Sequence, residues 1–328
     1  MRNRRYFVRK LLMLFLTGAL SLLAPAVVAQ TYPSKPIRII VPYAAGGVTD
    51  VLARRLAQAL TPTLGQPIVI DLKPGGSLII GAEAAARAAP DGYTLFIGSG
   101  GSHAINPNIF PKLPYDPVKD FDPVVAISDI QYVLCVNDAI PAKTLAEFVR
   151  YAKSRPGELN FASYGSGTSV HLGMELFKLQ AGIDMVHIPF KGNAPADQEL
   201  ASGRVQALIT AHSILNFVKQ GRARILAVTT AKRSAMLPDI PTVAESGYPG
   251  FEVKSWFGLF VPKGTPKEVV RLWNSEINRI LKAPDTAEWM RGMGLEPAGG
   301  TPEELGEQVS AESAKWKQVI ERAKLKLD

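Results

Sequence analysis

The sequence contains a single cysteine, Cys135, among 328 residues. An internal disulfide is therefore excluded even in an oxidising compartment, and so is a zinc site built from several cysteines. The chain also lacks His-Glu-x-x-His, Gly-x-Ser-x-Gly and Gly-x-Gly-x-x-Gly motifs. These absences remove the usual signatures of zinc peptidases, α/β-hydrolases and dinucleotide-binding enzymes. We expect no cofactor and no metal.

The first 29 residues predict a secretory signal peptide. A basic stretch, Arg2–Lys10, precedes the apolar run Leu11–Ala24, and Val27-Val28-Ala29 offers a cleavage site. The apolar run is shorter than the ~20 residues that a membrane-spanning helix needs, which favours cleavage after Ala29 over an uncleaved anchor. Arg4-Arg5 also resembles a twin-arginine signal, so the general and twin-arginine routes both stay open. The expected destination is the periplasm.

Most of the positive charge belongs to this leader. The formal net charge is +8, and removing the five basic residues of segment 1–29 lowers it to +3 over the remaining 299 residues. Such a balance does not indicate a nucleic-acid-binding protein, and it suits a protein that meets anionic ligands. A second apolar stretch of membrane-spanning length is missing from the sequence. We expect a soluble monomer of two domains.

Short apolar runs rich in β-branched residues alternate with helical patterns along the chain. This rhythm predicts an α/β fold with parallel strands joined by right-handed crossovers. We place domain 1 at residues 30–130 plus 252–328 and domain 2 at residues 131–251, with a ligand cleft between them. Predicted helix starts are Thr49 or Asp50 as N-cap, and capping boxes at Thr144–Glu147, Thr265–Glu268 and Thr301–Glu304.

Two glycine-rich loops join a predicted strand to a predicted helix. The first is Pro42–Asp50, and the second is Ala162–His171, which holds the hydroxyls of Ser163, Ser166, Thr168 and Ser169. Free backbone N–H groups at a helix start attract an anion, so the pair suits the two ends of a dianion. Ordinary strand-to-helix turns have the same composition, and that alternative stays open.

Other residues are candidates for the walls of such a site. The segment Gly98–His103, with Ser99 and His103, follows a predicted strand and forms a third wall. Tyr43, Tyr164 and Phe190 supply apolar lining of the kind that small-molecule pockets have. A hydrolase pairing of Ser163 or Ser166 with His171 is an alternative, although adjacency in sequence does not establish triad geometry. His187 lies in an apolar strand and is expected to be structural.

Many ordered segments together resemble the Bug proteins, the periplasmic solute-binding proteins of tripartite tricarboxylate transporters. The resemblance covers nearly all of the chain after the leader. It is carried by Tyr32–Arg38, Pro42–Asp50, Ala89–Leu95, His103–Pro107, Leu113–Phe121, Ala162–Leu172, His187–Gly192, Leu226–Thr230, Pro238–Gly247, Ser255–Phe260 and Pro262–Pro266.

The resemblance implies the two-domain Venus-flytrap fold of type II periplasmic binding proteins, in which each domain is a mixed sheet flanked by helices. It implies a membrane transporter as partner. It also implies that a ligand carboxylate is held by the two loops. One jaw is then Tyr43, Ala45, Gly46, Gly47 and Asp50, and the other is Ser163, Tyr164, Ser166, Gly167, Thr168 and His171. In this comparison Asp50 acts mainly as a helix cap that holds its loop.

Departures from the family pattern bear on the ligand. The family often has Asn-x-x-Gly-Ala-Gly-Gly where this chain has Asp71–Ser77, often has Asp near Glu199, and often has an acid where this chain has Thr210. Without an acid near Thr210 we expect a dicarboxylate, tricarboxylate or aromatic carboxylate rather than an amino acid. A ligand-presenting sensor for a membrane receptor kinase would use the same pocket, and a periplasmic hydrolase is the third alternative.

Overall fold

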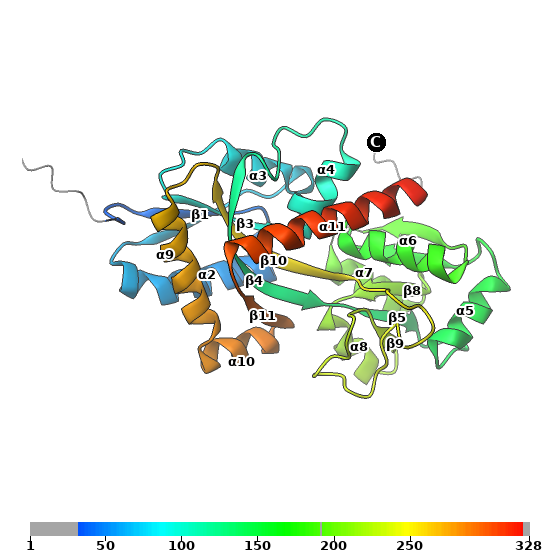
Figure 1. Ribbon diagram of the computed structural model, residues 1–328. Coiled ribbons are helices and arrows are strands. Elements are labelled where there is room, and N and C mark those ends of the chain that lie inside the picture. Colours follow the sequence, from blue (N-terminus) through cyan, green and yellow to red (C-terminus); the bar gives the residue numbers. More distant parts are fainter. Residues whose placement is uncertain (1–31, 191, 324–328) are drawn as a thin grey trace, which may run out of the picture. The chain divides into compact units, whose positions relative to one another are not determined.

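The computed structural model describes residues 32–190 and 192–323. The predicted signal peptide and its cleavage site therefore lie outside the described residues. The strands form two mixed sheets, A and B (Figure 1). No helix among residues 32–190 and 192–323 is long and apolar enough to cross a membrane.

Sheet A contains six strands in the order β11-β4-β10-β3-β1-β2. The apolar strand β1 pairs in parallel with β2 and β3, whereas β10 runs antiparallel to β3 and β4. The strands are β1 (Ile37–Val41), β2 (Ile68–Leu72), β3 (Thr94–Ser99), β4 (Phe121–Gln131), β10 (Lys254–Pro262) and β11 (Leu295–Gly299).

Sheet B contains five strands in the order β7-β6-β8-β5-β9. Its parallel part, β6 with β7 and β8, repeats the arrangement of β1 with β2 and β3, and β5 runs antiparallel to β8 and β9. The strands are β5 (Val133–Asn137), β6 (Asn160–Ser163), β7 (Val186–Pro189), β8 (Ala207–Thr210) and β9 (Ala223–Val228).

Helices connect and flank these strands. The parallel pairs are joined through helices, as the strand-helix-strand rhythm predicts. The helices are α2 (Val48–Leu64), η2 (Gly76–Leu78), α3 (Ile79–Ala86), η3 (Gly101–Ile105), α4 (Asn106–Ile109), α5 (Leu145–Lys153), α6 (Ser169–Ala181), α7 (Asn193–Ser202), η4 (His212–Ile214), α8 (Leu215–Lys219), α9 (Lys267–Leu281), α10 (Pro284–Gly292) and α11 (Pro302–Arg322).

Two of the three predicted capping boxes are confirmed, at the starts of α5 and α11. The third, at Thr265–Glu268, was wrong. Helix α9 begins at Lys267 with Pro266 in the N-cap position, and the hydroxyl of Thr265 donates instead to the carbonyl of Pro262 (2.7 Å). The threonine is one residue too early to cap this helix.

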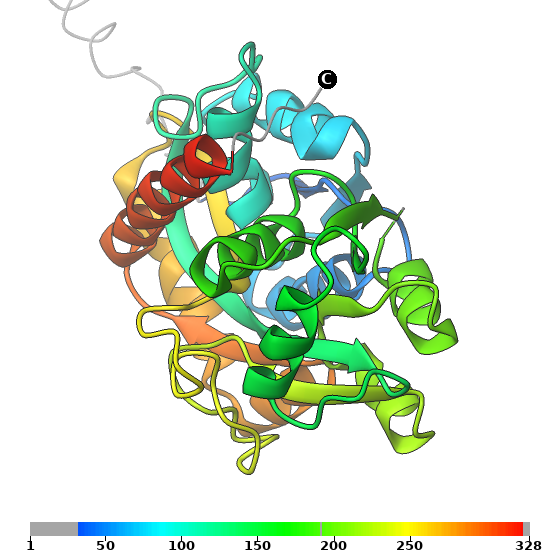
Figure 2. The same cartoon turned by 90° about the vertical axis from the view of Figure 1, so that its right-hand side faces the viewer.

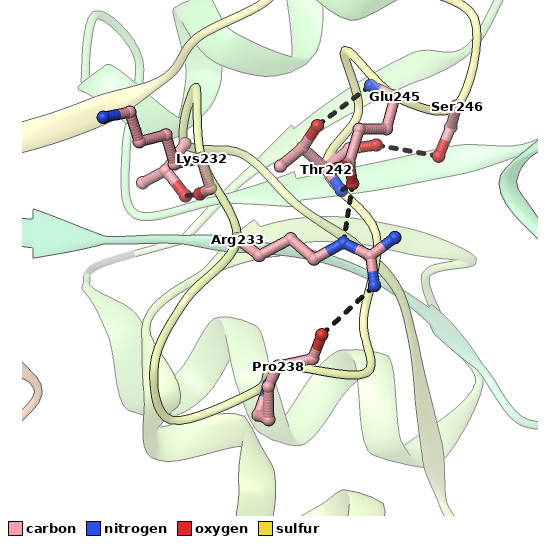
Figure 3. A network of polar contacts seen from close by, with 7 residues as sticks. Lys232, Arg233, Pro238, Thr242, Glu245 and Ser246 are labelled. Carbon is pink, nitrogen blue, oxygen red and sulfur yellow. Dashed lines mark hydrogen bonds and ion pairs between the residues drawn. The ribbon is translucent and has the colours of Figure 1, made fainter.

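The chain passes from sheet A to sheet B at Tyr132 and returns through residues 229–253. Thr229 joins the two passages, because its backbone N–H and its hydroxyl both donate to the carbonyl of Tyr132 (3.0 Å each) and its hydroxyl also lies 2.6 Å from the carbonyl of Val253. Polar contacts hold the returning segment in shape (Figure 3): Arg233 donates to Glu245 (2.9 Å), which in turn accepts from the N–H of Thr242 (2.8 Å).

Helix α11 belongs to both hydrophobic cores. Leu305 and Val309, near its start, lie in a cluster with Phe96 and Trp256 of sheet A. Trp316, Val319 and Ile320, near its end, lie in a cluster with residues of sheet B and α6. Both views show α11 running from the strands of sheet A to the side of α6 (Figures 1 and 2), and the two helices are in contact.

Candidate functional site

The first loop connects β1 to α2 and presents exposed backbone. Ala45, Gly46 and Gly47 are exposed, and Gly47 is the N-cap of α2, which begins at Val48. The prediction of Thr49 or Asp50 as N-cap was wrong, because the helix starts earlier than the apolar stripe that predicted it. The exposed N–H groups at this helix start have the positive end of the helix dipole behind them.

Asp50 holds the first loop rather than facing the solvent. It is only 4% exposed; one carboxylate oxygen accepts from the N–H of Gly46 (2.9 Å) and the other pairs with Arg54 (2.8 Å). Its charge is therefore offset within α2. Asp50 therefore holds its loop as expected, but it is not the helix cap, because Gly47 occupies the N-cap position.

Tyr43 and Ser99 form a wall beside the first loop. The hydroxyl of Tyr43 donates to Ser99 Oγ (2.8 Å), and its ring meets Phe257 edge-on. Burial raises the pKa of Tyr43 to about 12, although the bond to Ser99 opposes the shift. Both groups are neutral at physiological pH, so this wall offers hydroxyls and an aromatic edge.

His103 lies in the aromatic core of sheet A. Its ring is fully buried and stacks on Phe260 with 3.9 Å between centroids, while Nδ1 bonds with the hydroxyl of Ser102 (2.9 Å). Burial lowers the pKa of His103 to about 3, so the ring is neutral. The sequence placed His103 in a wall of the site; in the structure it supports the turn after β3 from within.

The second loop connects β6 to α6 and repeats the first in outline. Ser166 is exposed, and Thr168 is the N-cap of α6. The hydroxyl of Thr168 donates to the carbonyl of Gly165 (2.8 Å), and the N–H of Gly167 donates to His171 Nδ1 (3.0 Å). The loop is thus closed by its own side chains, with Ser166 at its exposed tip.

Two stacked imidazoles support this loop. His171 and His187 lie 3.8 Å apart at their centroids, and His187 Nε2 lies 2.6 Å from Ser163 Oγ. Burial, together with each ring's charged neighbours, lowers the pKa of His171 to about 3 and that of His187 to about 4. Because both rings are neutral, each can accept as well as donate a hydrogen bond and so help to fix the loop.

The serine-histidine contact differs from the hydrolase pairing considered above. Ser163 meets His187 instead of His171, and it is fully buried. Its oxygen also exchanges hydrogen bonds with the backbone of Gly165. No carboxylate among the described residues hydrogen-bonds to His187, so the third member of a triad is missing from this part of the chain.

A buried polar network that the sequence reasoning missed lies behind the second loop. Asp197, 2% exposed, accepts from Thr210 (2.6 Å), Ser213 (2.7 Å) and Asn193 (3.2 Å). Asn193 also donates to the hydroxyl of Tyr164 (2.7 Å), which lies 2.7 Å from Thr210 Oγ1. Burial raises the pKa of Asp197 against the effect of these donors.

Counting hydrogens fixes the direction of this network. Thr210 has one hydroxyl hydrogen, which goes to Asp197, so Tyr164 must donate its own hydrogen to Thr210. The oxygen of Tyr164 accepts from the N–H of Ala211 (2.9 Å) as well. Tyr164 and Thr210 therefore have no hydrogen left for a ligand, and Tyr164 can present only its ring.

The expectation that no acid lies near Thr210 was wrong. Asp197 contacts Thr210, whereas Glu199, two residues along α7, pairs with Arg204 (2.8 Å). A carboxylate whose oxygens are already occupied by three donors is a poor partner for a ligand's amino group.

Phe190 is half-buried against the core of sheet B, and its N–H donates to the carbonyl of Ser163 (3.0 Å).

Tyr132, which the sequence analysis did not single out, lies at the passage from sheet A to sheet B. It is 6% exposed, and its hydroxyl bonds with Ser255. Burial raises the pKa of Tyr132. Its side chain belongs to the hydrophobic cluster against which the half-buried Tyr164 of the second loop packs.

A hollow of about 790 Å³ lies elsewhere, between residues 107–120 and α11. Neither glycine-rich loop lines it, so its size alone does not make it the candidate site. Within the described residues no group of three or more His, Cys, Asp or Glu side chains is arranged to hold a metal ion.

Comparison with known proteins places the chain in a family. The sequence profile of the tripartite tricarboxylate transporter family receptor, TctC, matches residues 52–325. Protein BugT of Bordetella pertussis is 37% identical over 307 residues, which is 93% of this chain and 94% of that protein.

Two solved structures share the fold over most of their length. Rpa4515 of R. palustris, determined with adipate, has 38% identity and a TM-score of 0.80 over 89% of this chain and 98% of its own. MatC from Rhodopseudomonas palustris with bound malate has 33% identity and a TM-score of 0.77 over 88% of this chain and 100% of its own. The predicted periplasmic-binding-protein fold, with mixed sheets flanked by helices, is confirmed. The chain belongs to the tripartite tricarboxylate transporter receptor family of periplasmic solute-binding proteins.

Proposed function

We propose that this protein captures a small organic carboxylate between its first and second loops and delivers it to the membrane subunits of a tripartite tricarboxylate-type transporter. The ligand is a dicarboxylate, a tricarboxylate or an aromatic carboxylate. The two proposed domains, residues 30–130 plus 252–328 and residues 131–251, lie on either side of it. No covalent chemistry is required of the protein, which works in the periplasm as a monomer.

The observation that carries this proposal is the repetition of one element in the two sheets. In each sheet a parallel strand ends in a glycine-containing loop with exposed residues that starts a helix, α2 in one case and α6 in the other. Helix starts of this kind bind carboxylates through backbone N–H groups. We propose that one ligand with an acidic group at each end meets both helix starts.

The relatives determined with adipate and malate support the carboxylate class. The walls in this chain add hydroxyls and aromatic surface from Tyr43, Ser99 and the ring of Tyr164, which suit the uncharged middle of such a ligand. Asp50 pairs with Arg54 and with the N–H of Gly46, and Asp197 is occupied by three donors, so neither acid has an oxygen left to attract an amino group on a ligand.

Thermal-shift titration of the purified protein, refolded to remove carried ligand, tests the proposal. The panel contains aliphatic dicarboxylates, tricarboxylates, aromatic acids and acidic amino acids. A carboxylate that binds only the folded state should stabilise it by about 2.7 kcal/mol at 100 times its dissociation constant. If none of the panel shifts the melting temperature, the carboxylate proposal fails.

The variant Gly47→Leu ties the ligand to the first loop. Gly47 has an ordinary φ of −74°, and the nearest atom to an added Cβ is 3.4 Å away, so a side chain fits the fold. It would cover the exposed N–H groups, and we expect at least a tenfold loss of affinity. Gly292→Leu in α10, where an added Cβ meets nothing within 4 Å, is the matched control. Equal affinities in both variants would place the ligand elsewhere.

Hydrolysis is the competing proposal, and the contact between the buried Ser163 and His187 is the pairing on which it can be tested. A hydrolase would turn over ester or amide substrates and lose that turnover in Ser163→Ala. A binding protein returns its ligand unchanged, which mass spectrometry of the recovered ligand decides.

A further inference from the structure

The segment between β2 and α3 contains unusual backbone. Among the described residues, Ser77 (φ 51°) and Leu78 (φ 76°) are the non-glycine residues with positive φ. Leucine is disfavoured there because its Cβ approaches the following carbonyl oxygen, and glycine is the usual occupant. Strain of this kind persists only when surrounding contacts impose it, and it is found most often at ligand-contacting sites.

Three contacts impose this conformation. The amide of Asn106 donates to the carbonyl of Ser77 (2.7 Å), and the N–H of Leu78 donates to the carbonyl of Gly75 (3.1 Å). Three residues after Leu78, Gly81 packs so closely that an added Cβ would lie 2.7 Å from Cβ of Pro42, the first residue of the first loop. The segment is therefore held against the first loop.

The side chain of Leu78 packs over Gly101, on whose other side lies Ser99 of the wall formed by Tyr43 and Ser99. A Cβ placed on Gly101 would lie 2.9 Å from Cδ1 of Leu78 and 3.5 Å from Oγ of Ser99. Leu78 thus occupies the space that the missing side chain of Gly101 leaves, beside the serine that accepts from Tyr43. It remains half-exposed, so part of its surface is available for contact.

We propose that Leu78 is a specificity-determining residue that favours carboxylates with an apolar body over short hydroxylated ones. The inference rests on the proposed function and deepens it. A strained backbone places a branched apolar side chain next to the hydroxyl and aromatic wall of the first loop. The ligand class that fits carries its carboxylates on a chain of several methylenes or on an aromatic ring.

Paired titrations with adipate and malate test the proposal. In Leu78→Gly the side chain is removed and the positive φ becomes unstrained, so the fold is retained. We expect adipate affinity to fall about fivefold, the factor for losing one to two methylene contacts, and malate affinity to change less than about twofold. Leu78→Ala, which keeps the strain, should show the same selective loss. Val118→Ala, at an exposed apolar residue (63%), is the control.

Each outcome decides between the alternatives. A selective loss of adipate in both Leu78 variants, with Val118→Ala unchanged, supports the proposal. Equal changes for both ligands, or no change, overturn it and leave the carboxylate function standing. If the unaltered protein binds neither adipate, malate nor any other acid of the thermal-shift panel, the proposed function falls and the role of Leu78 falls with it.

Discussion

A double-mutant cycle on Tyr164 and Thr210 probes the buried network directly. Thr210→Val keeps the volume but removes the hydroxyl that donates to Asp197 at 2.6 Å and lies 2.7 Å from the hydroxyl of Tyr164. Thr210 is fully buried, so water cannot replace these bonds. Losing a donor to a carboxylate and stranding a tyrosine hydrogen should cost about 2–4 kcal/mol of unfolding free energy.

Tyr164→Phe removes the other end of the same bond. It also leaves the N–H of Ala211 without its acceptor, so we expect a cost of about 1–3 kcal/mol. The double variant should be more stable than the sum of the two losses predicts, by about 1–2 kcal/mol, because the shared hydrogen bond is lost only once.

Guanidinium unfolding followed by far-ultraviolet circular dichroism measures all four proteins at one pH. The unfolding free energy should fall with denaturant concentration at the same slope in all four proteins, so that differences in the unfolding midpoint report differences in stability. Thr61→Val is the control, since the hydroxyl of exposed Thr61 donates only to a carbonyl within its own helix. If the stability losses of the two single variants add up to that of the double variant within about 0.5 kcal/mol, the hydrogen-bond chain in which Tyr164 donates to Thr210 and Thr210 donates to Asp197 is refuted.

Three further changes test other contacts. His103 has a folded pKa of about 3 against an unfolded value near 6.5, so its contribution to stability is complete above pH 6.5 and is lost as the pH falls toward 3. His103→Phe should therefore flatten the acid side of the stability profile, by up to about 1.4 kcal/mol per pH unit, and parallel profiles would contradict this. Trp256→Phe removes the indole N–H that donates to the half-buried carboxylate of Glu312 at 2.7 Å, and it should cost about 1–3 kcal/mol in denaturant unfolding; a loss below about 0.5 kcal/mol would contradict it. Gly81→Ala forces a Cβ to within 2.7 Å of Pro42 and should lower stability by about 1–3 kcal/mol, whereas an unchanged melting temperature would show that the packing yields freely.

The sequence predicted the parallel strands well because their pattern is local. The strands Ile37–Val41 and Ile68–Leu72 coincide with short apolar runs between turn residues, a pattern that leaves few alternatives. Helix starts were harder. Gly47, the N-cap of α2, has no side chain that would mark it as a cap in the sequence. Thr265 is a residue type that often caps helices, but it lies one residue before the N-cap of α9.

The candidate site was predicted in its loops and missed in its support. Asp197 and Asn193 face Thr210 only because α7 packs beside β8, a tertiary fact that no local pattern carries. Leu78 was missed because a leucine gives no hint of left-handed backbone, which here is imposed by the contacts of Asn106, Gly75 and Gly81.

The placement of α11 has a consequence for folding. Its first turns complete the core of sheet A and its last turns complete the core that includes sheet B, so residues 302–322 are shared by both. Contacts this distant in sequence form late, because closing the long loop between them costs conformational entropy before any contact is made that offsets it. A chain still lacking this helix would keep apolar surface exposed on both sheets at once. Both cores should therefore become stable together, in one cooperative step, when α11 docks.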